Sequence, residues 1–132
     1  RGGTMRNFDI KLDAEKNIVT INYYGTTHYR TLLQSLDDLF SLYIPKDVRI
    51  VFDFSETESL LISYSQINNF RQGLRSIFPH RAVSKIAIIN PPVDSWGGKI
   101  CSSQPVVLNN DFHEFDLRCY GADQKNEAYK WV

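Results

Sequence analysis

The stretch Val48-Arg-Ile-Val-Phe-Asp-Phe54 decides the fold. Its nearly continuous apolar character is typical of a central strand of a parallel sheet, which is covered on both faces. In α/β proteins, ligands and catalytic groups usually gather at the carboxyl ends of such strands. Here Ser55-Glu-Thr-Glu-Ser59 follows, and we expect a loop that offers hydroxyls and carboxylates without a base. Because neither a glycine-rich phosphate loop nor a nucleophile elbow follows the strand, the sequence favours a binding or regulatory domain over an enzyme.

The residues before this strand predict a β-hairpin and a helix. Apolar and polar residues alternate over 8–12 and again over 19–23, with turn residues between them. Gly25 is expected to end the second strand. Apolar residues spaced on one helical stripe then predict a helix over 29–43, which Pro45 stops.

The residues after the strand predict further crossover units. Apolar residues at three- and four-residue spacing predict a second helix from Ser63 or Ser65 to Phe78. Strands are predicted over 83–89 and 114–120, followed by a short helix capped near Asp123. Since crossovers between parallel strands are right-handed, this order predicts an α/β fold. We expect a single mixed, mostly parallel sheet of about five strands, with an antiparallel N-terminal hairpin and about four helices.

Length and composition fit one ordinary globular domain. The chain has 132 residues, 42% of them hydrophobic and 23% charged, with a formal net charge of zero. We assign 5–132 to the domain and interpret Arg1-Gly-Gly-Thr4, ahead of the only methionine, as a remnant of the expression vector. No run approaches the ~18 apolar residues of a membrane-spanning helix, so we expect a cytoplasmic protein. Cys101 and Cys119 are expected to be reduced thiols.

Several of these segments together resemble a known family. They are the hairpin, the helix over 29–43, the strand ending in Phe52-Asp-Phe54, the strand Lys85-Ile-Ala-Ile-Ile89 and the closing Asn126-Glu-Ala-Tyr-Lys-Trp131. In this order they resemble the STAS fold, in its STAS-like branch related to sporulation anti-sigma-factor antagonists, over almost the whole chain. The resemblance implies a non-enzymatic regulatory or protein-interaction module. The alternative that it allows is a binder or carrier of a hydrophobic small molecule or lipid.

Ser63 is the candidate phosphorylation site that this resemblance implies. The antagonists carry an Asp-Ser-Ser-Gly type motif after the third strand, and phosphorylation of its serine switches partner binding. Leu61-Ile-Ser-Tyr64 occupies roughly that place here, without the acidic residue, the paired serine or the glycine. The alternative role of Ser63 is to cap the following helix. A phosphate there would be favoured by the helix dipole.

The predicted recognition surface combines the segment 55–64 with a tryptophan in the long connection 90–110. Asp53 stands at the carboxyl end of the central strand, where it can hold a ligand or metal, or accept hydrogen bonds from the following turn. Glu56 makes this rim acidic, which disfavours anionic nucleotides. Trp96 can line a flap over an apolar pocket or pack on the sheet edge. The predicted partner- or ligand-binding residues are Asp53, Ser55, Glu56, Ser63, Tyr64 and Trp96.

The sequence offers little for catalysis, metals or nucleic acid. Its histidines, at positions 28, 80 and 113, lack the spacing of a zinc site, and we predict no metal, cofactor or catalytic residue. Cys101, His113 and Asp116 could be named as a catalytic triad. Their presence in the sequence alone does not support one, because a triad requires the nucleophile and the base to lie within hydrogen-bonding distance. Arg71 and Arg75 share a helix face that can meet an acidic partner or solvent. We expect a protein partner, no nucleic acid and no stable membrane insertion, and the antiparallel edge strand makes a homodimer a further alternative.

Overall fold

The computed structural model describes residues 7–41, 48–63, 65–66, 69–70, 72, 85–91 and 116–132. Within these ranges it contains five strands, two α-helices and one 3-10 helix. In chain order they are β1 (Phe8–Asp13), β2 (Ile18–His28), α1 (Tyr29–Ser41), β3 (Arg49–Leu61), β4 (Lys85–Ile89), β5 (Asp116–Tyr120), η2 (Ala122–Gln124) and α4 (Lys125–Trp131).

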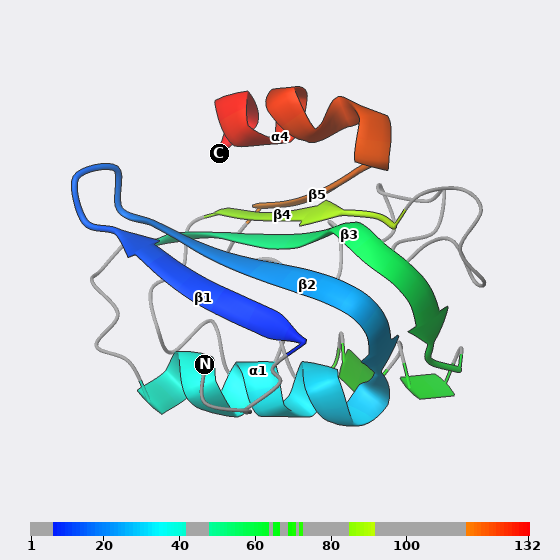
Figure 1. The fold of residues 1–132 in the computed structure, drawn as a ribbon. Coiled ribbons are helices and arrows are strands. Elements are labelled where there is room, and N and C mark those ends of the chain that lie inside the picture. The colour runs from blue at the N-terminus through cyan, green and yellow to red at the C-terminus, as the bar shows by residue number, and fades with distance from the viewer. Residues whose placement is uncertain are drawn as a thin grey trace.

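The five strands form one sheet in the order β1-β2-β3-β4-β5. β1 pairs antiparallel with β2, and every later pair is parallel. β3 therefore lies in the middle of the sheet, with neighbours parallel to it on both sides (Figure 1). The predicted mixed sheet with an N-terminal hairpin and a central strand from Val48 to Phe54 is confirmed.

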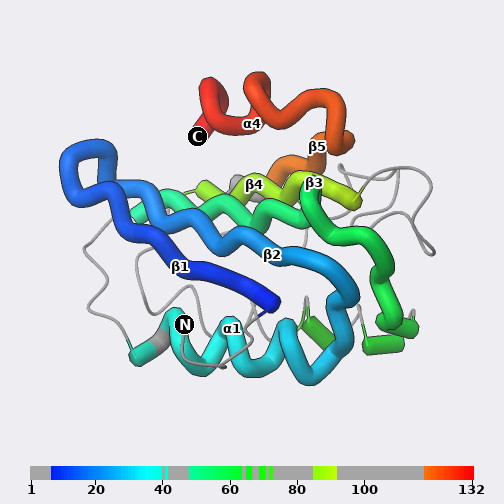
Figure 2. The backbone as a smooth tube through the Cα atoms, in the orientation of Figure 1, coloured from blue at the N-terminus to red at the C-terminus, as the bar shows by residue number. Residues whose placement is uncertain are grey.

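Helices cover both faces of the sheet. α1 packs on one face and α4 on the other, as Figure 2 shows in the same orientation as Figure 1. Along β3, Ile50 and Phe52 belong to the larger hydrophobic core on the α1 side, whereas Val51 belongs to the smaller core beneath α4. Both faces of β3 are buried, which explains the apolar run in its sequence.

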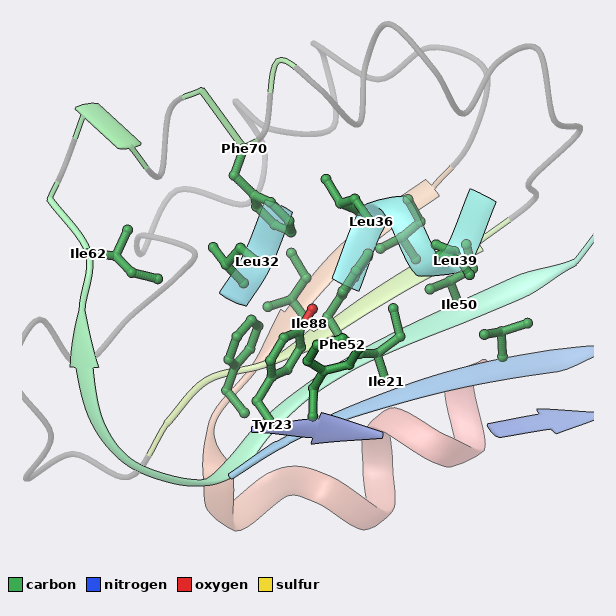
Figure 3. Close-up of a cluster of buried hydrophobic side chains, with 14 of the residues drawn as sticks. Ile21, Tyr23, Leu32, Leu36, Leu39, Ile50, Phe52, Ile62, Phe70 and Ile88 are labelled. Atoms are coloured by element: carbon green, nitrogen blue, oxygen red, sulfur yellow. The ribbon is translucent and has the colours of Figure 1, made fainter. Parts of the chain in front are cut away.

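Aromatic and aliphatic side chains fill the larger core between the sheet and α1 (Figure 3). The rings of Tyr23 and Phe54 stack with centroids 4.2 Å apart, and Phe70 meets Phe52 edge to face at 5.5 Å. The buried Tyr23 hydroxyl lies 2.7 Å from Ser35 Oγ, which donates to the Leu32 carbonyl. Burial raises the pKa of Tyr23 far above its ordinary value, so this phenol stays protonated.

Strands β2 and β3 are longer than the sequence predicted. Gly25 does not end β2, which continues to His28, and the expected loop 55–59 is part of β3. Gly25 adopts a φ of 62°, and register shifts beside it absorb the irregularity without ending the pairing. The side chains of Thr27 and Thr57 are buried, and their hydroxyl oxygens form a hydrogen bond at 3.3 Å. This bond links the parts of β2 and β3 that lie beyond Gly25 and Asp53. As a result, a two-stranded parallel ribbon runs past the last β3–β4 pair, Asp53 with Ile89, and curves towards the first turn of α1 (Figure 1).

The predicted helices are confirmed only in part. The helix expected over 29–43 is present as α1, and the closing helix is present as α4 with Ala128 fully buried. Of the second predicted helix, residues 65–66, 69–70 and 72 are helical, and its remainder lies outside the described residues. The described part of the chain thus holds two α-helices with described bounds, besides these helical residues, whereas about four helices were predicted. Neither combines the length and apolar character that crossing a membrane requires.

The prediction of reduced thiols is wrong. Cys119, on β5, is disulfide-bonded. The only other cysteine of the chain, Cys101, lies outside the described residues. Composition could not decide this point, because disulfide formation depends on the distance and orientation of two Cβ atoms.

Candidate functional site

A surface hollow of about 640 Å³ lies where β2 and β3 end beside the start of α1. His28 is the last residue of β2 and pairs with Leu61, the last residue of β3. Because α1 begins at the very next residue, Tyr29, its first turn is held against the ends of both strands. The side chains that line the hollow are those of His28, Tyr29, Arg30, Thr31, Leu33, Leu61 and Gln66.

Two leucines make the lining apolar. Leu33 is 43% exposed and Leu61 is 50% exposed, although both neighbouring leucines, Leu32 and Leu60, are fully buried. On α1 the core stripe passes through Leu32, and Leu33 lies about 100° away from it. On β3 successive side chains alternate between faces, so Leu61 points away from the core when Leu60 points into it. The fold itself therefore directs both leucines outward into one hollow.

The polar part of the lining carries positive charge. Arg30 and His28 are exposed, and none of the seven lining residues is acidic. The first turn of α1 contains no acidic residue either, so no side chain there offsets the partial positive charge at the amino end of the helix. The hollow thus combines apolar contact area with an electropositive rim.

Ser63 caps the helical segment that follows β3. Its backbone N–H donates to Gln66 Oε1 at 2.9 Å, and the Gln66 N–H donates to Ser63 Oγ at 3.2 Å. This reciprocal pair is a capping box, so the predicted N-cap role of Ser63 is confirmed. Because Gln66 also lines the hollow, the exposed Ser63 hydroxyl lies close to its rim. Phosphorylation of Ser63 stays a prediction, and Tyr64 lies outside the described residues.

Asp53 is on the opposite face of the sheet and anchors α4. Its carboxylate is 1% exposed; Oδ1 accepts from the Ser55 N–H at 2.9 Å and from Ser55 Oγ at 2.6 Å. Oδ2 accepts from the Tyr129 hydroxyl at 3.0 Å and lies 3.2 Å from Lys125 Nζ. Glu56, which is exposed, reaches the same ammonium at 4.0 Å. Burial, and after it the charge of Asp53, raises the pKa of Tyr129 well above its ordinary range.

These contacts match the second role that the sequence allowed for Asp53, in which its carboxylate accepts hydrogen bonds from the residues that follow it. All four groups at its oxygens come from this chain, and a ligand- or partner-binding role for Asp53, Ser55 or Glu56 stays a prediction. Among the described residues, no cluster of three or more His, Cys, Asp or Glu side chains could hold a metal ion. In the same part of the chain, every buried side-chain nitrogen and oxygen has a hydrogen-bond partner.

The predicted recognition surface is thus divided between two places. Asp53, Ser55 and Glu56 belong to the α4 face, and Ser63 stands near the hollow on the α1 side. Trp96 and the other predicted residues of 92–115, like Arg71, Arg75 and His80, lie outside the described residues. Sequence reasoning missed Arg30. It included Leu61 only as part of the predicted segment 55–64, and it placed Leu33 on the core-facing stripe of the helix, which is wrong because Leu33 is 43% exposed. The signal for the two leucines was present but weak: Leu33 directly follows the buried Leu32, so both cannot face the core of one helix, and Leu61 breaks the strand alternation after Leu60.

Comparison with known proteins supports the fold. No protein-family model matches the chain, and no curated protein matches it. Among solved structures, it is similar to an uncharacterised protein of the DUF3478 family with a SpoIIAA-like fold, from Shewanella loihica PV-4. The TM-score is 0.56 at 12% sequence identity, and the similarity covers 98% of this chain and 97% of that chain. This confirms the STAS-like fold that the sequence predicted, and at this identity it bears on the fold alone.

Proposed function

We propose that this STAS-like domain is a non-enzymatic module that acts by binding a protein partner at the hollow beside α1. The observation that carries the proposal is the placement of two half-exposed leucines, Leu33 and Leu61, in one concave surface site. Single exposed leucines are ordinary on protein surfaces, whereas apolar side chains that converge in a hollow offer a pocket for a partner's anchor residue.

The expected gain from covering these leucines can be estimated. At 43% and 50% exposure, the two together expose almost as much as one fully exposed leucine. Fully burying a leucine side chain is worth about 1.5–3 kcal/mol, so the hollow can supply a comparable amount to binding. Since about 1.4 kcal/mol corresponds to tenfold in Kd, loss of this contact should weaken a partner by roughly ten- to a hundredfold.

A comparison of three baits tests the proposal. Wild type, Leu61→Asp and Leu12→Asp are immobilised, and the proteins that each retains from an extract of the source cells are quantified by mass spectrometry. Leu12 is a matched control because it is as exposed as Leu33, at 43%, and lies on β1 paired with Val19, far along β2 from His28. A partner is expected on wild type and Leu12→Asp and is lost on Leu61→Asp. Equal capture by all three folded baits would refute the proposed function.

The second candidate function is binding of a hydrophobic small molecule. The volume of the hollow, about 640 Å³, falls within the range of about 300–1,000 Å³ that is typical of ligand sites, and this supports the alternative. Native mass spectrometry of the purified protein would then show an added mass that disappears in Leu33→Asp. A protein of bare chain mass that still captures a partner through Leu61 would favour the first function.

A further inference from the structure

We infer that the segment docking in the hollow is an acidic peptide, with a leucine-like side chain in contact with Leu33 and Leu61 and carboxylates facing Arg30. This inference rests on the proposed function and deepens it by stating the chemistry of the partner. The apolar contact area does not by itself determine the charge of the partner. The charge of the lining residues does, and the inference follows from it.

The positions on α1 place charge and apolar surface side by side. Arg30 and Leu33 are three residues apart, so they share one helix face with Cβ atoms about 5–6 Å apart. Both side chains line the hollow, and both are exposed. A partner that covers Leu33 therefore brings its neighbouring residues within reach of the Arg30 guanidinium.

The amino end of α1 adds to the positive electrostatic potential that Arg30 creates at the hollow. The helix has 13 residues and begins at the hollow, and its first turn carries Arg30 and no acidic side chain. Partial positive charge at this end favours anions. His28, directly before the helix, also lines the hollow and offers a ring N–H as a further donor to a carboxylate. None of the lining residues that the structure describes is acidic, so none of them repels an anionic partner.

The nearest acidic residue on α1 sets a direction for the bound segment. Asp37 lies one helical turn beyond Leu33 and does not line the hollow. Carboxylates of the partner are therefore favoured over the first turn of α1 and disfavoured towards Asp37. An acidic segment should lie with its charges on the Arg30 side of its apolar anchor.

Three fluorescent peptides of about twelve residues provide the test. They share the same leucine positions, and the residues between these are glutamate and aspartate, glutamine, or lysine. Affinity is measured by fluorescence anisotropy, and the site is mapped from amide chemical shifts. The acidic peptide is expected to bind most tightly and to shift the amides of 28–33, 61 and 66. Raising salt from about 0.05 M to about 0.5 M should weaken it, because exposed charges are screened.

Charge-reversal variants sharpen the test. Arg30→Glu should weaken the acidic peptide by about fivefold or more, as expected for loss and reversal of an exposed ion pair. Lys11→Glu makes the same reversal at an exposed position on β1 and should leave binding unchanged. Equal effects of the two variants, tighter binding of the neutral or basic peptide, or no binding of any peptide would each overturn the inference. So would decanoate, if it caused the same shifts and bound more tightly than the acidic peptide.

Failure of this inference can be distinguished from failure of the proposed function. A partner captured through Leu61 whose binding is insensitive to Arg30→Glu and to salt would leave the function standing and reject the acidic segment. Absence of any Leu61-dependent partner would instead reject the function, and the inference with it.

Discussion

Replacing Asp53 by asparagine should release α4 from the sheet more than it disturbs any other element. The carboxylate receives two hydrogen bonds from Ser55, one from Tyr129 and an ion pair from Lys125, all while 1% exposed. The asparagine side chain keeps its size and one acceptor oxygen. Its NH2 group, however, can only donate, and it must face either the Ser55 groups or the Tyr129 hydroxyl and the Lys125 ammonium.

The expected loss follows from these contacts. Hydrogen bonds to a charged group contribute about 1.5–3 kcal/mol each, and breaking a buried pair costs about 3–5 kcal/mol. Because the Lys125 side chain is 38% exposed, its share is reduced by solvent screening. We therefore expect Asp53→Asn to lower the free energy of unfolding by about 2–3 kcal/mol, or the Tm by roughly 6–12 °C for a chain of this size.

Two measurements check this prediction. Urea unfolding gives the stability loss, and hydrogen exchange locates it: amides of α4 should exchange faster while those of α1 keep their protection relative to global unfolding. Asp9→Asn is the matched control, since Asp9 is half-buried and accepts a hydrogen bond from the Tyr24 hydroxyl at 3.1 Å. It should cost less than about 1 kcal/mol. Equal losses for the two variants, or unchanged exchange in α4, would refute the anchoring role of Asp53.

Three further predictions concern the cap, the tyrosines and the strand irregularity. Ser63→Ala should lower the free energy of unfolding by about 1 kcal/mol, whereas Ser63→Asp keeps a capping oxygen and should stay near wild type in thermal unfolding. If Ser63 is a phosphorylation switch, Ser63→Asp also changes the set of captured proteins, and an unchanged set removes Ser63 from that role. The raised pKa values of Tyr23 and Tyr129 mean that the folded state favours the protonated phenols. Their stabilisation is complete below the unfolded pKa of 10.0 and falls as pH rises above it, so urea titrations at about pH 8 and about pH 11 should show lower stability at the higher pH; equal stability would contradict it. Gly25→Ala meets no atom within 4 Å of the new Cβ but places a side chain at a φ of 62°, so it should cost about 1–2 kcal/mol, and Gly25→Asn should cost less; equal losses would mean that φ is not the cause.

The central sheet could be predicted because its signals are local. The run from Val48 to Phe54 is apolar at every position except Arg49 and Asp53. Such a nearly continuous apolar run is typical of a strand that is buried on both faces of its sheet. The hairpin turn could be predicted equally well, because the turn segment ends in an asparagine. In the structure Asn17 adopts the left-handed conformation, with a φ of 59°, that asparagine tolerates.

The candidate site could not be predicted in the same way, because its geometry arises from pairing between distant residues. Ser55 to Ser59 is polar and predicted a loop, yet β2 supplies a parallel partner for the whole segment. Gly25 was interpreted as a strand end, whereas it marks an irregularity within β2, and the β-branched Thr26 and Thr27 after it are compatible with a strand. The convergence of His28 and Leu61 depends on this extended register, which local propensity does not encode.

The hollow follows from the same rules that build the core, applied one residue further along the chain. Leu32 and Leu60 are fully buried, and their successors Leu33 and Leu61 are turned outward by the helical and strand periodicities. The first member of each pair therefore fills the core, and the second is the one that we propose for binding. The proposed partner would cover the exposed half of each of these two leucines, and this exposed surface is the part that the core does not use. In the proposed complex, Arg30 and the amino end of α1 would favour an acidic partner over a basic one, because complementary charge contributes to specificity.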